Sequence, residues 1–221
     1  MNKEFVIANE IKGAIFDMDG TLTDSMSKWS EIYGVLADFL QVNLPDDLTV
    51  KLNCIPMQKR VEKLAEELLL NIDTAELYEI WLKRAREFYG NVFKIKPYML
   101  ETVKLLHSLN ISMAIASATD PACIIDFINS NELSHYFKCI TGLDEVQRSK
   151  NFPDIYLKTA DKLKVRPSEC LVFEDTLVTV KSAKKGGFIV CGVQDDCSAA
   201  DMLEIKEISD LTLGFDRVGN I

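Results

Sequence analysis

Two aspartates separated by a single residue stand near the start of the chain. Asp17 and Asp19 directly follow the apolar run 11–16 and precede Gly20. That run is typical of a buried strand, so the carboxylates are predicted at a strand's carboxyl end, where open α/β sheets bind ligands. Two like charges this close resist joint ionisation, and a divalent cation that prefers oxygen ligands, such as Mg²⁺, relieves the repulsion. One carboxylate could then attack phosphorus while the other exchanges a proton with the leaving oxygen.

Polar residues recur where the later apolar runs end. Ser117 ends one predicted strand, and Lys150 and the pair 174–175 follow two others. Because parallel strands end at the same edge of a sheet, these side chains could converge on one crevice with Asp17 and Asp19. Together they supply a nucleophile, an acid/base, a hydroxyl donor, a cation and an acidic metal site, as phosphoryl transfer requires. Singly, each has an ordinary explanation as a turn, a helix cap or a solvated charge, so the prediction depends on the joint arrangement.

Composition narrows the classes of function. The chain has 221 residues, of which 48% are hydrophobic, so a packed core is expected rather than disorder. The net charge of −9 argues against binding to nucleic acid or anionic membranes. The six cysteines include no C-x-x-C pair, which favours a reducing compartment and disfavours zinc. Without a signal-like stretch or a run of ~18 apolar residues, a cytoplasmic location is expected.

The spacing of apolar residues changes twice along the chain. After the first strand, they repeat at spacings of three and four in predicted helices at 26–40, 61–69 and 77–88, with Asp73 as a helix cap and Gly90 as a stop. From residue 97, predicted strands and helices alternate, which indicates a mainly parallel sheet with right-handed crossovers. The expected strands of this sheet are 11–16, 111–117, 137–141, 170–173 and 188–193.

These patterns predict an α/β fold with two parts. Residues 1–23 and 95–221 are expected to form a doubly wound, parallel-sheet, Rossmann-like catalytic core. Residues 24–94, called the insertion below, are expected to form an inserted α-helical cap domain. In the core, Asp120 is predicted to begin a helix that turns Ile124, Ile125 and Ile128 inward.

The order and spacing of the polar residues resemble the haloacid dehalogenase superfamily of phosphohydrolases. The resemblance spans nearly the whole chain and points to the branch of β-phosphoglucomutase and phosphoglycolate phosphatase, whose helical cap follows the first motif. Two departures occur: Asn151 and Phe152 replace a Pro and a small residue, and Thr176 replaces the usual Ser. The segments that match the four family motifs are 17–21, 114–117, Lys150 with 153–154, and 174–175.

The resemblance implies a role for each matching residue. Asp17 would be the nucleophile that forms an aspartyl-phosphate, and Asp19 would protonate the leaving group and then activate water. The implied phosphate-binding groups are Thr21, Ser117, the Ala118 amide and Lys150. The implied Mg²⁺ ligands are Asp17, the Asp19 carbonyl oxygen and Asp175, with direct or indirect support from Glu174. The chain would then be a magnesium-dependent phosphatase that acts on a small phosphorylated metabolite, as a monomer or weak homodimer.

The cap of such enzymes should set specificity, and the sequence offers few candidates. Trp29, Asn53, Cys54, Gln58 and Arg60 could face the substrate. Arg60, next to another cation on a predicted helix, is expected to be a solvated charge. Trp29, at helical spacing, is expected to lie in the core of the insertion.

Several alternatives remain open at this stage. A phosphoacceptor receiver domain is disfavoured because its acidic pair precedes the acceptor Asp and it has no helical insertion. A C–halogen hydrolase is disfavoured because it would have no acid/base at Asp19. A sugar-phosphate mutase is less favoured than a hydrolase because the insertion contains no His, although Lys28 could replace it. A carbon–phosphorus hydrolase would need a cap Lys, for which the candidates are Lys28, Lys51, Lys59 and Lys63.

Overall fold

A parallel β-sheet forms the centre of the computed structural model, which describes residues 3–44, 52, 55–69 and 71–214. The order β3-β2-β1-β4-β5-β6 shows that the chain first builds outward on one side of β1 and then on the other. All neighbouring strands are parallel, which confirms the predicted doubly wound fold. The strands are β1 (Gly13–Phe16), β2 (Ser112–Ser117), β3 (Phe137–Gly142), β4 (Cys170–Glu174), β5 (Ile189–Val193) and β6 (Leu211–Leu213).

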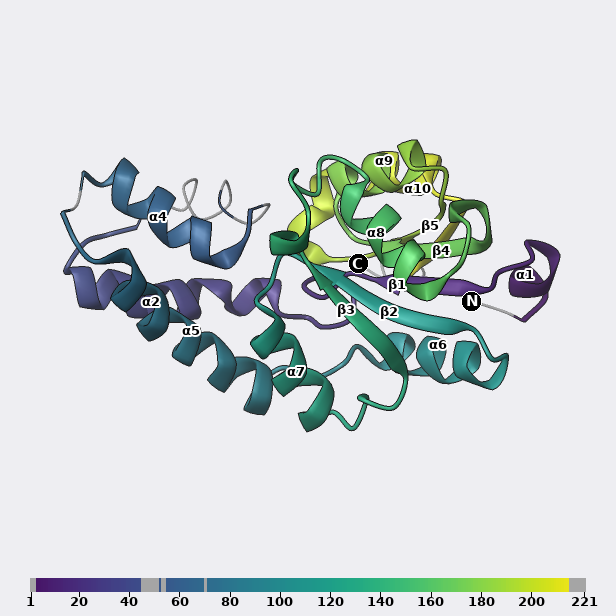
Figure 1. The fold of residues 1–221 in the computed structure, drawn as a ribbon, viewed down its shortest axis with the longest axis horizontal. Helices are drawn as coiled ribbons and strands as arrows, with labels where there is room; N and C mark the ends of the chain where they lie inside the picture. The colour runs from purple at the N-terminus through teal and green to yellow at the C-terminus, as the bar shows by residue number, and fades with distance from the viewer. Residues whose placement is uncertain (1–2, 45–51, 53–54, 70, 215–221) are drawn as a thin grey trace, which may run out of the picture.

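Helices cover both faces of the sheet (Figure 1). Successive residues of β1 explain why, because side chains alternate between the two faces of a strand. Phe16 belongs to a core cluster with residues of α6 and α7, whereas Ile15 belongs to a second cluster with residues of α8, α9 and α10. All four residues of β1 are buried, as its unbroken apolar run predicts. The helices are α6 (Pro97–Ser108), α7 (Pro121–Ser130), α8 (Asp154–Leu163), α9 (Leu177–Lys185) and α10 (Met202–Ile208).

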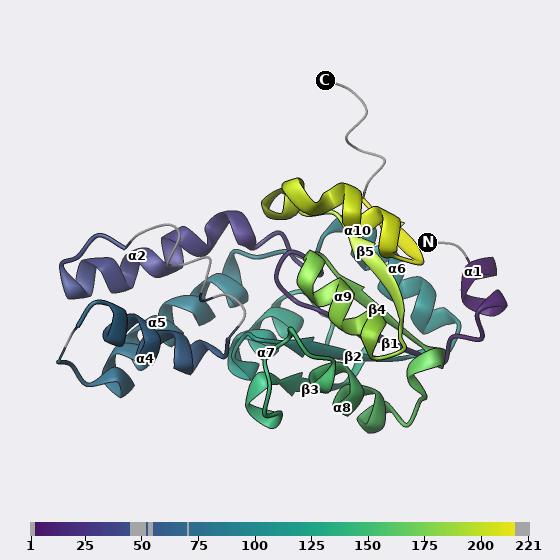
Figure 2. The same cartoon turned by 90° about the horizontal axis from the view of Figure 1, so that it is seen from above.

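The insertion extends from the end of the sheet where the strands finish (Figures 1 and 2). Its described residues form helices and no strand. The chain leaves and re-enters the core side by side, since Thr23 pairs with Ile95 and its hydroxyl donates to the Lys94 carbonyl at 2.9 Å. The exact limits predicted at residues 24 and 94 stay predictions. The elements are η1 (Met26–Lys28), α2 (Trp29–Leu40), α4 (Met57–Glu67) and α5 (Thr74–Asn91).

The helix starts predicted at Asp73 and Asp120 are confirmed, because each side chain binds the backbone of its helix. Asp73 and Asp120 cap α5 and α7 by accepting from the amides of Ala75 and Ala122, at 2.9 and 2.8 Å. The predicted stop at Gly90 is wrong, because α5 continues through Asn91.

The inward position predicted for Ile125 is also wrong, since this side chain is 45% exposed while its neighbour Ile124 is fully buried. Helix α1 (Lys3–Ala8), α10 and β6 are absent from the predictions, because segments of three to seven residues are too short to show a period. Of the helices in the described part of the chain, none is long and apolar enough to cross a membrane.

Candidate active site

The carboxyl ends of β1, β2 and β4 meet at one edge of the sheet. Strand β1 pairs directly with both β2 and β4, so Asp17, which follows β1, lies between the ends of the other two strands. A cavity of about 80 Å³ opens at this edge. The predicted site residues that line it are Asp17, Asp19, Ser117, Ala118, Lys150, Glu174 and Asp175.

Lys150 is a buried cation held between two carboxylates. Its ammonium group donates to Asp17 Oδ1 and lies 2.6 Å from Glu174 Oε1. Burial by itself would lower the pKa of Lys150, but the charges of Asp17 and Glu174 outweigh this effect and raise the pKa above its usual value. The side chain therefore keeps a positive charge at the site in an otherwise acidic chain.

Three carboxylates beside Lys150 form a cluster that fits a divalent cation. Oxygen atoms of Asp17, Glu174 and Asp175 lie within 4.8 Å of one another, and all three residues are buried. Burial is the main cause that raises the pKa of Asp17 to about 7; Glu174 adds to the rise and Lys150 opposes it. Burial, followed by the charges of Asp17 and Glu174, also raises the pKa of Asp175 well above its usual value. A bound cation would favour the ionised forms that burial disfavours, and hard carboxylate oxygens suit Mg²⁺.

The turn after Asp19 packs against this cluster. Gly20 has a φ of +81°, and a side chain there would collide with the Asp175 carboxylate. The Thr21 hydroxyl donates to Asp175 Oδ1 at 3.0 Å, and Thr21 is fully buried. Thr21 therefore supports an acidic residue of the cluster and does not line the cavity, and its predicted contact with phosphate stays a prediction.

Asp19 also lines the cavity, and its carboxylate lies among hydrogen-bond donors. Its Oδ1 accepts from the Ser25 hydroxyl at 2.5 Å, from Trp29 Nε1 at 3.3 Å and from the Tyr89 hydroxyl. Its Oδ2 accepts from the Thr119 hydroxyl. The predicted acid/base therefore contacts both the insertion and the loop after β2.

The end of β2 supplies small polar groups. Ser117 is 2% exposed, and its hydroxyl oxygen accepts from the Thr119 amide at 3.1 Å. Ser117 and Ala118 line the same cavity as Asp17. A hydroxyl and a neighbouring backbone amide are groups that can bind phosphate oxygens.

Tyr156 belongs to the site and is absent from the sequence predictions. This buried residue of α8 donates its hydroxyl to Glu174 Oε1 at 2.5 Å, and its ring centre lies 5.6 Å from Lys150 Nζ. The helical spacing of the apolar residues in α8 places Tyr156 on the buried face. That position could have identified it as a candidate, because the hydroxyl of a buried Tyr needs a hydrogen-bond partner.

The insertion closes the cavity with Met26, Trp29 and Arg60. The expectation that Arg60 is solvated is wrong: the residue is 3% exposed, its guanidinium lies 5.3 Å from the Trp29 ring centre, and its Nε donates to the Ile55 carbonyl at 2.8 Å. Trp29 packs on Tyr33 and Trp81 as predicted, but it also faces the cavity.

Two other predicted specificity residues, Asn53 and Cys54, lie outside the described residues. Gln58 is exposed on α4 and does not line the cavity.

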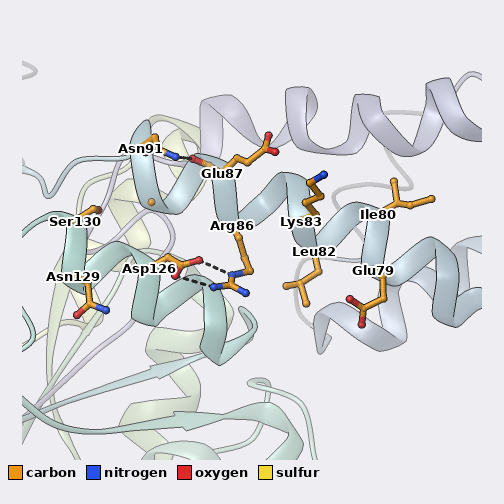
Figure 3. Close-up of a pocket in the computed structure, with 11 residues that line it drawn as sticks. Glu79, Ile80, Leu82, Lys83, Arg86, Glu87, Asn91, Asp126, Asn129 and Ser130 are labelled. Carbon is orange, nitrogen blue, oxygen red and sulfur yellow. Dashed lines mark hydrogen bonds and ion pairs between the residues drawn. The ribbon is translucent and has the colours of Figure 1, made fainter.

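A larger hollow of about 1050 Å³ lies elsewhere, between α5 and α7 (Figure 3). Arg86 and Asp126 form an ion pair across it, with Nε and Oδ2 2.6 Å apart. None of the predicted site residues in the described part of the chain lines it. The smaller cavity at the strand ends is therefore the candidate active site, because the charges and hydrogen-bonding groups gather there.

Comparisons with known proteins identify the family and the fold. The model of the haloacid dehalogenase-like hydrolase family matches residues 14–193. A phosphorylated carbohydrates phosphatase of Thermotoga maritima is 26% identical, over 80% of this chain and 82% of its own. A beta-phosphoglucomutase of Bacillus subtilis is also 26% identical, over 92% of each chain. The crystal structure of CbbY from Rhodobacter sphaeroides in complex with phosphate has the same fold, with a TM-score of 0.80, 19% identity and coverage of 95% of this chain and 96% of that one.

Proposed function

The chain belongs to the haloacid dehalogenase-like hydrolases, and from that membership we propose that it hydrolyses a small phosphomonoester through an aspartyl-phosphate on Asp17. As an enzyme it is a phosphoric monoester hydrolase. The observation that carries the proposal is the position of Asp17, buried beside Lys150 and the acidic cluster at the strand ends. A relative named for phosphorylated carbohydrates supports a sugar phosphate as the substrate.

In the proposed reaction, Asp17 and Asp19 act in two steps. An Asp17 oxygen bonds to phosphorus as the bond to the leaving oxygen breaks, and Asp19 gives that oxygen a proton. Asp19 then takes a proton from water, whose oxygen attacks phosphorus and breaks the bond to Asp17. Lys150, Ser117 and the Ala118 amide hold the phosphate oxygens, and Thr21 is the remaining predicted contact.

The residues proposed to hold Mg²⁺ are Asp17, Asp175 and the Asp19 carbonyl oxygen, with Glu174 in support. The close approach and burial of the three carboxylates Asp17, Glu174 and Asp175 support this choice. When bound, the ion would supply positive charge that offsets the negative charge of the phosphate. Lys150 would add to this effect, because its ammonium group is paired with both Asp17 and Glu174.

A screen of small phosphate esters tests the proposed function. Sugar phosphates, phosphoglycolate, nucleotides and other esters would be incubated with the protein and Mg²⁺, and free phosphate would be measured. We expect turnover of at least one ester by the wild-type protein and none by folded Asp17→Asn. Equal phosphate release by both proteins would contradict the proposal.

Mutase activity is the second candidate, because a beta-phosphoglucomutase matches over 92% of its length. Hydrolysis is favoured because the insertion contains no His, and Lys28, the possible replacement, is exposed and ion-paired with Glu31 at 2.7 Å. The test supplies β-glucose 1-phosphate with a catalytic amount of bisphosphate primer and follows both products by phosphorus NMR. Glucose 6-phosphate formed faster than free phosphate would favour the mutase.

No observation favours the carbon–phosphorus hydrolase. Lys28, Lys59 and Lys63 are exposed, and Lys51 lies outside the described residues. Among the described residues that line the cavity, Lys150 of the core is the single lysine.

A further inference from the structure

The carboxylate of Asp19 has an uneven set of hydrogen-bond partners. Three donors meet at Oδ1: the hydroxyls of Ser25 and Tyr89 and the indole N–H of Trp29. The single donor at Oδ2 in the described structure is the Thr119 hydroxyl. A hydroxyl can rotate and accept a hydrogen bond, whereas an indole N–H can only donate. Oδ1 is therefore fixed as an acceptor, and Oδ2 is the oxygen better placed to carry a transferable proton.

Tyr89 is a donor whose position is fixed by the packing of its ring. It is fully buried in the last turns of α5, and its ring packs edge-on against Phe93 with centres 4.9 Å apart. The centre of the Trp29 ring lies 6.3 Å from that of Tyr89, and the Tyr89 hydroxyl lies 3.5 Å from the Thr119 hydroxyl. Because the ring cannot move without disturbing this packing, its hydroxyl holds Asp19 in one orientation.

We propose that Tyr89 is a positioning residue for Asp19, whose hydroxyl holds Oδ1 so that Oδ2 faces the leaving oxygen of the substrate. This inference rests on the proposed function. It adds a residue of the insertion, 70 positions from Asp19, to a proton transfer otherwise assigned to the core. Its role is distinct from substrate binding, because Tyr89 does not line the cavity.

The proposal predicts a dependence on the leaving group. An alkoxide leaves with difficulty unless an acid protonates it, whereas p-nitrophenolate leaves readily without that help. A misplaced Asp19 should therefore impair cleavage of an alkyl phosphate far more than cleavage of p-nitrophenyl phosphate. A general disturbance of the fold would impair both substrates equally.

The experiment measures kcat/KM of Tyr89→Phe for an alkyl phosphate hydrolysed by the wild-type protein and for p-nitrophenyl phosphate. We expect a loss of about 10- to 100-fold for the alkyl ester, a part of the ~10²–10⁴-fold that general acid–base catalysis contributes, and a loss several times smaller for the nitrophenyl ester. Tyr78→Phe is the matched control: Tyr78 lies on the same helix and donates to Asp120 of the core, but does not contact Asp19. Its effect should be small and the same for both esters.

Equal losses for the two esters, or no loss, would overturn the proposal. If Tyr89→Phe fails to fold, Ser25→Ala removes another donor to Oδ1 and should show the same preference. If the wild-type protein hydrolyses neither ester, that result counts against the proposed function and says nothing about Tyr89. A crystal structure of Tyr89→Phe then decides the positioning role, since an unchanged Asp19 side chain would contradict it and a reoriented one would support it.

Discussion

Two walls enclose the candidate active site, and they come from different parts of the fold. The wall from the core is charged, with Asp17, Lys150, Glu174 and Asp175 at the strand ends. The wall from the insertion is largely apolar and aromatic, with Arg60 as its one cation among the described lining residues. The core wall has the groups that the proposed phosphoryl transfer needs, and the insertion wall lines the same cavity. We infer that the core provides the catalytic groups and that the insertion selects and orients the substrate.

The largest expected effect comes from the core wall. Asp17→Asn should lower kcat by roughly 10⁴-fold or more, because an amide cannot replace the carboxylate nucleophile and loss of a nucleophile can cost about 10⁶-fold. Steady-state phosphate release measures the effect. Asp161→Asn, which changes an exposed carboxylate on α8, is the control and should stay active. Near-normal turnover by folded Asp17→Asn would show that the nucleophile is not on the core wall.

Removal of the metal should abolish turnover, as loss of the Asp17 carboxylate should. Burial and the negative charges of neighbouring carboxylates raise the pKa of Asp17 and of Asp175, which disfavours their ionised forms, and an anionic phosphate would add to the repulsion. Exhaustive chelation should therefore abolish turnover, and added Mg²⁺ should restore it. Circular dichroism before and after chelation controls for unfolding. Full activity in the chelated protein would show that Lys150 alone is enough to neutralise the site.

Asp19 lies where the two walls meet, and its loss should cost less than that of Asp17. Asp19→Asn should lower kcat by about 10²–10⁴-fold, the usual contribution of general acid–base catalysis. Rapid-quench kinetics with an alkyl phosphate would show whether formation or hydrolysis of the phosphoenzyme slows. A change below tenfold in both steps would assign the proton transfer to another group.

The smallest predicted effect comes from a substitution in the insertion wall. Arg60→Gln should raise KM about tenfold for the best substrate, the loss of one hydrogen bond to a charged group, while kcat changes less. Lys59→Gln, the exposed neighbour on α4, is the matched control and should leave KM unchanged. Equal KM values for the wild-type protein and Arg60→Gln would show that Arg60 does not contribute to substrate binding.

The same division explains what the sequence could predict. Asp17, Ser117 and Glu174 are placed by their own strands, and short apolar runs followed by polar residues mark the ends of such strands. The parallel order of those strands then brings the side chains together. Local sequence is therefore enough to predict most of the core wall.

The contacts of the insertion depend instead on helix packing. Tyr89 meets Asp19 from a position 70 residues away, and no local pattern fixes such a distance. Arg60 is buried because its side of α4 faces Trp29, although its residue type favours a solvated position. Tyr156 shows an intermediate case, since its burial follows from the helix period but its partner Glu174 does not.

Detection of the phosphoryl group on Asp17 tests the central claim most directly. The protein would be mixed with its best substrate and Mg²⁺, quenched in acid within milliseconds, digested and analysed by mass spectrometry. We expect a phosphate mass on the peptide that contains Asp17, absent without substrate and absent in Asp17→Asn. Rapid turnover with no phosphorylated peptide at any quench time, or with the phosphate on another residue, would contradict the account.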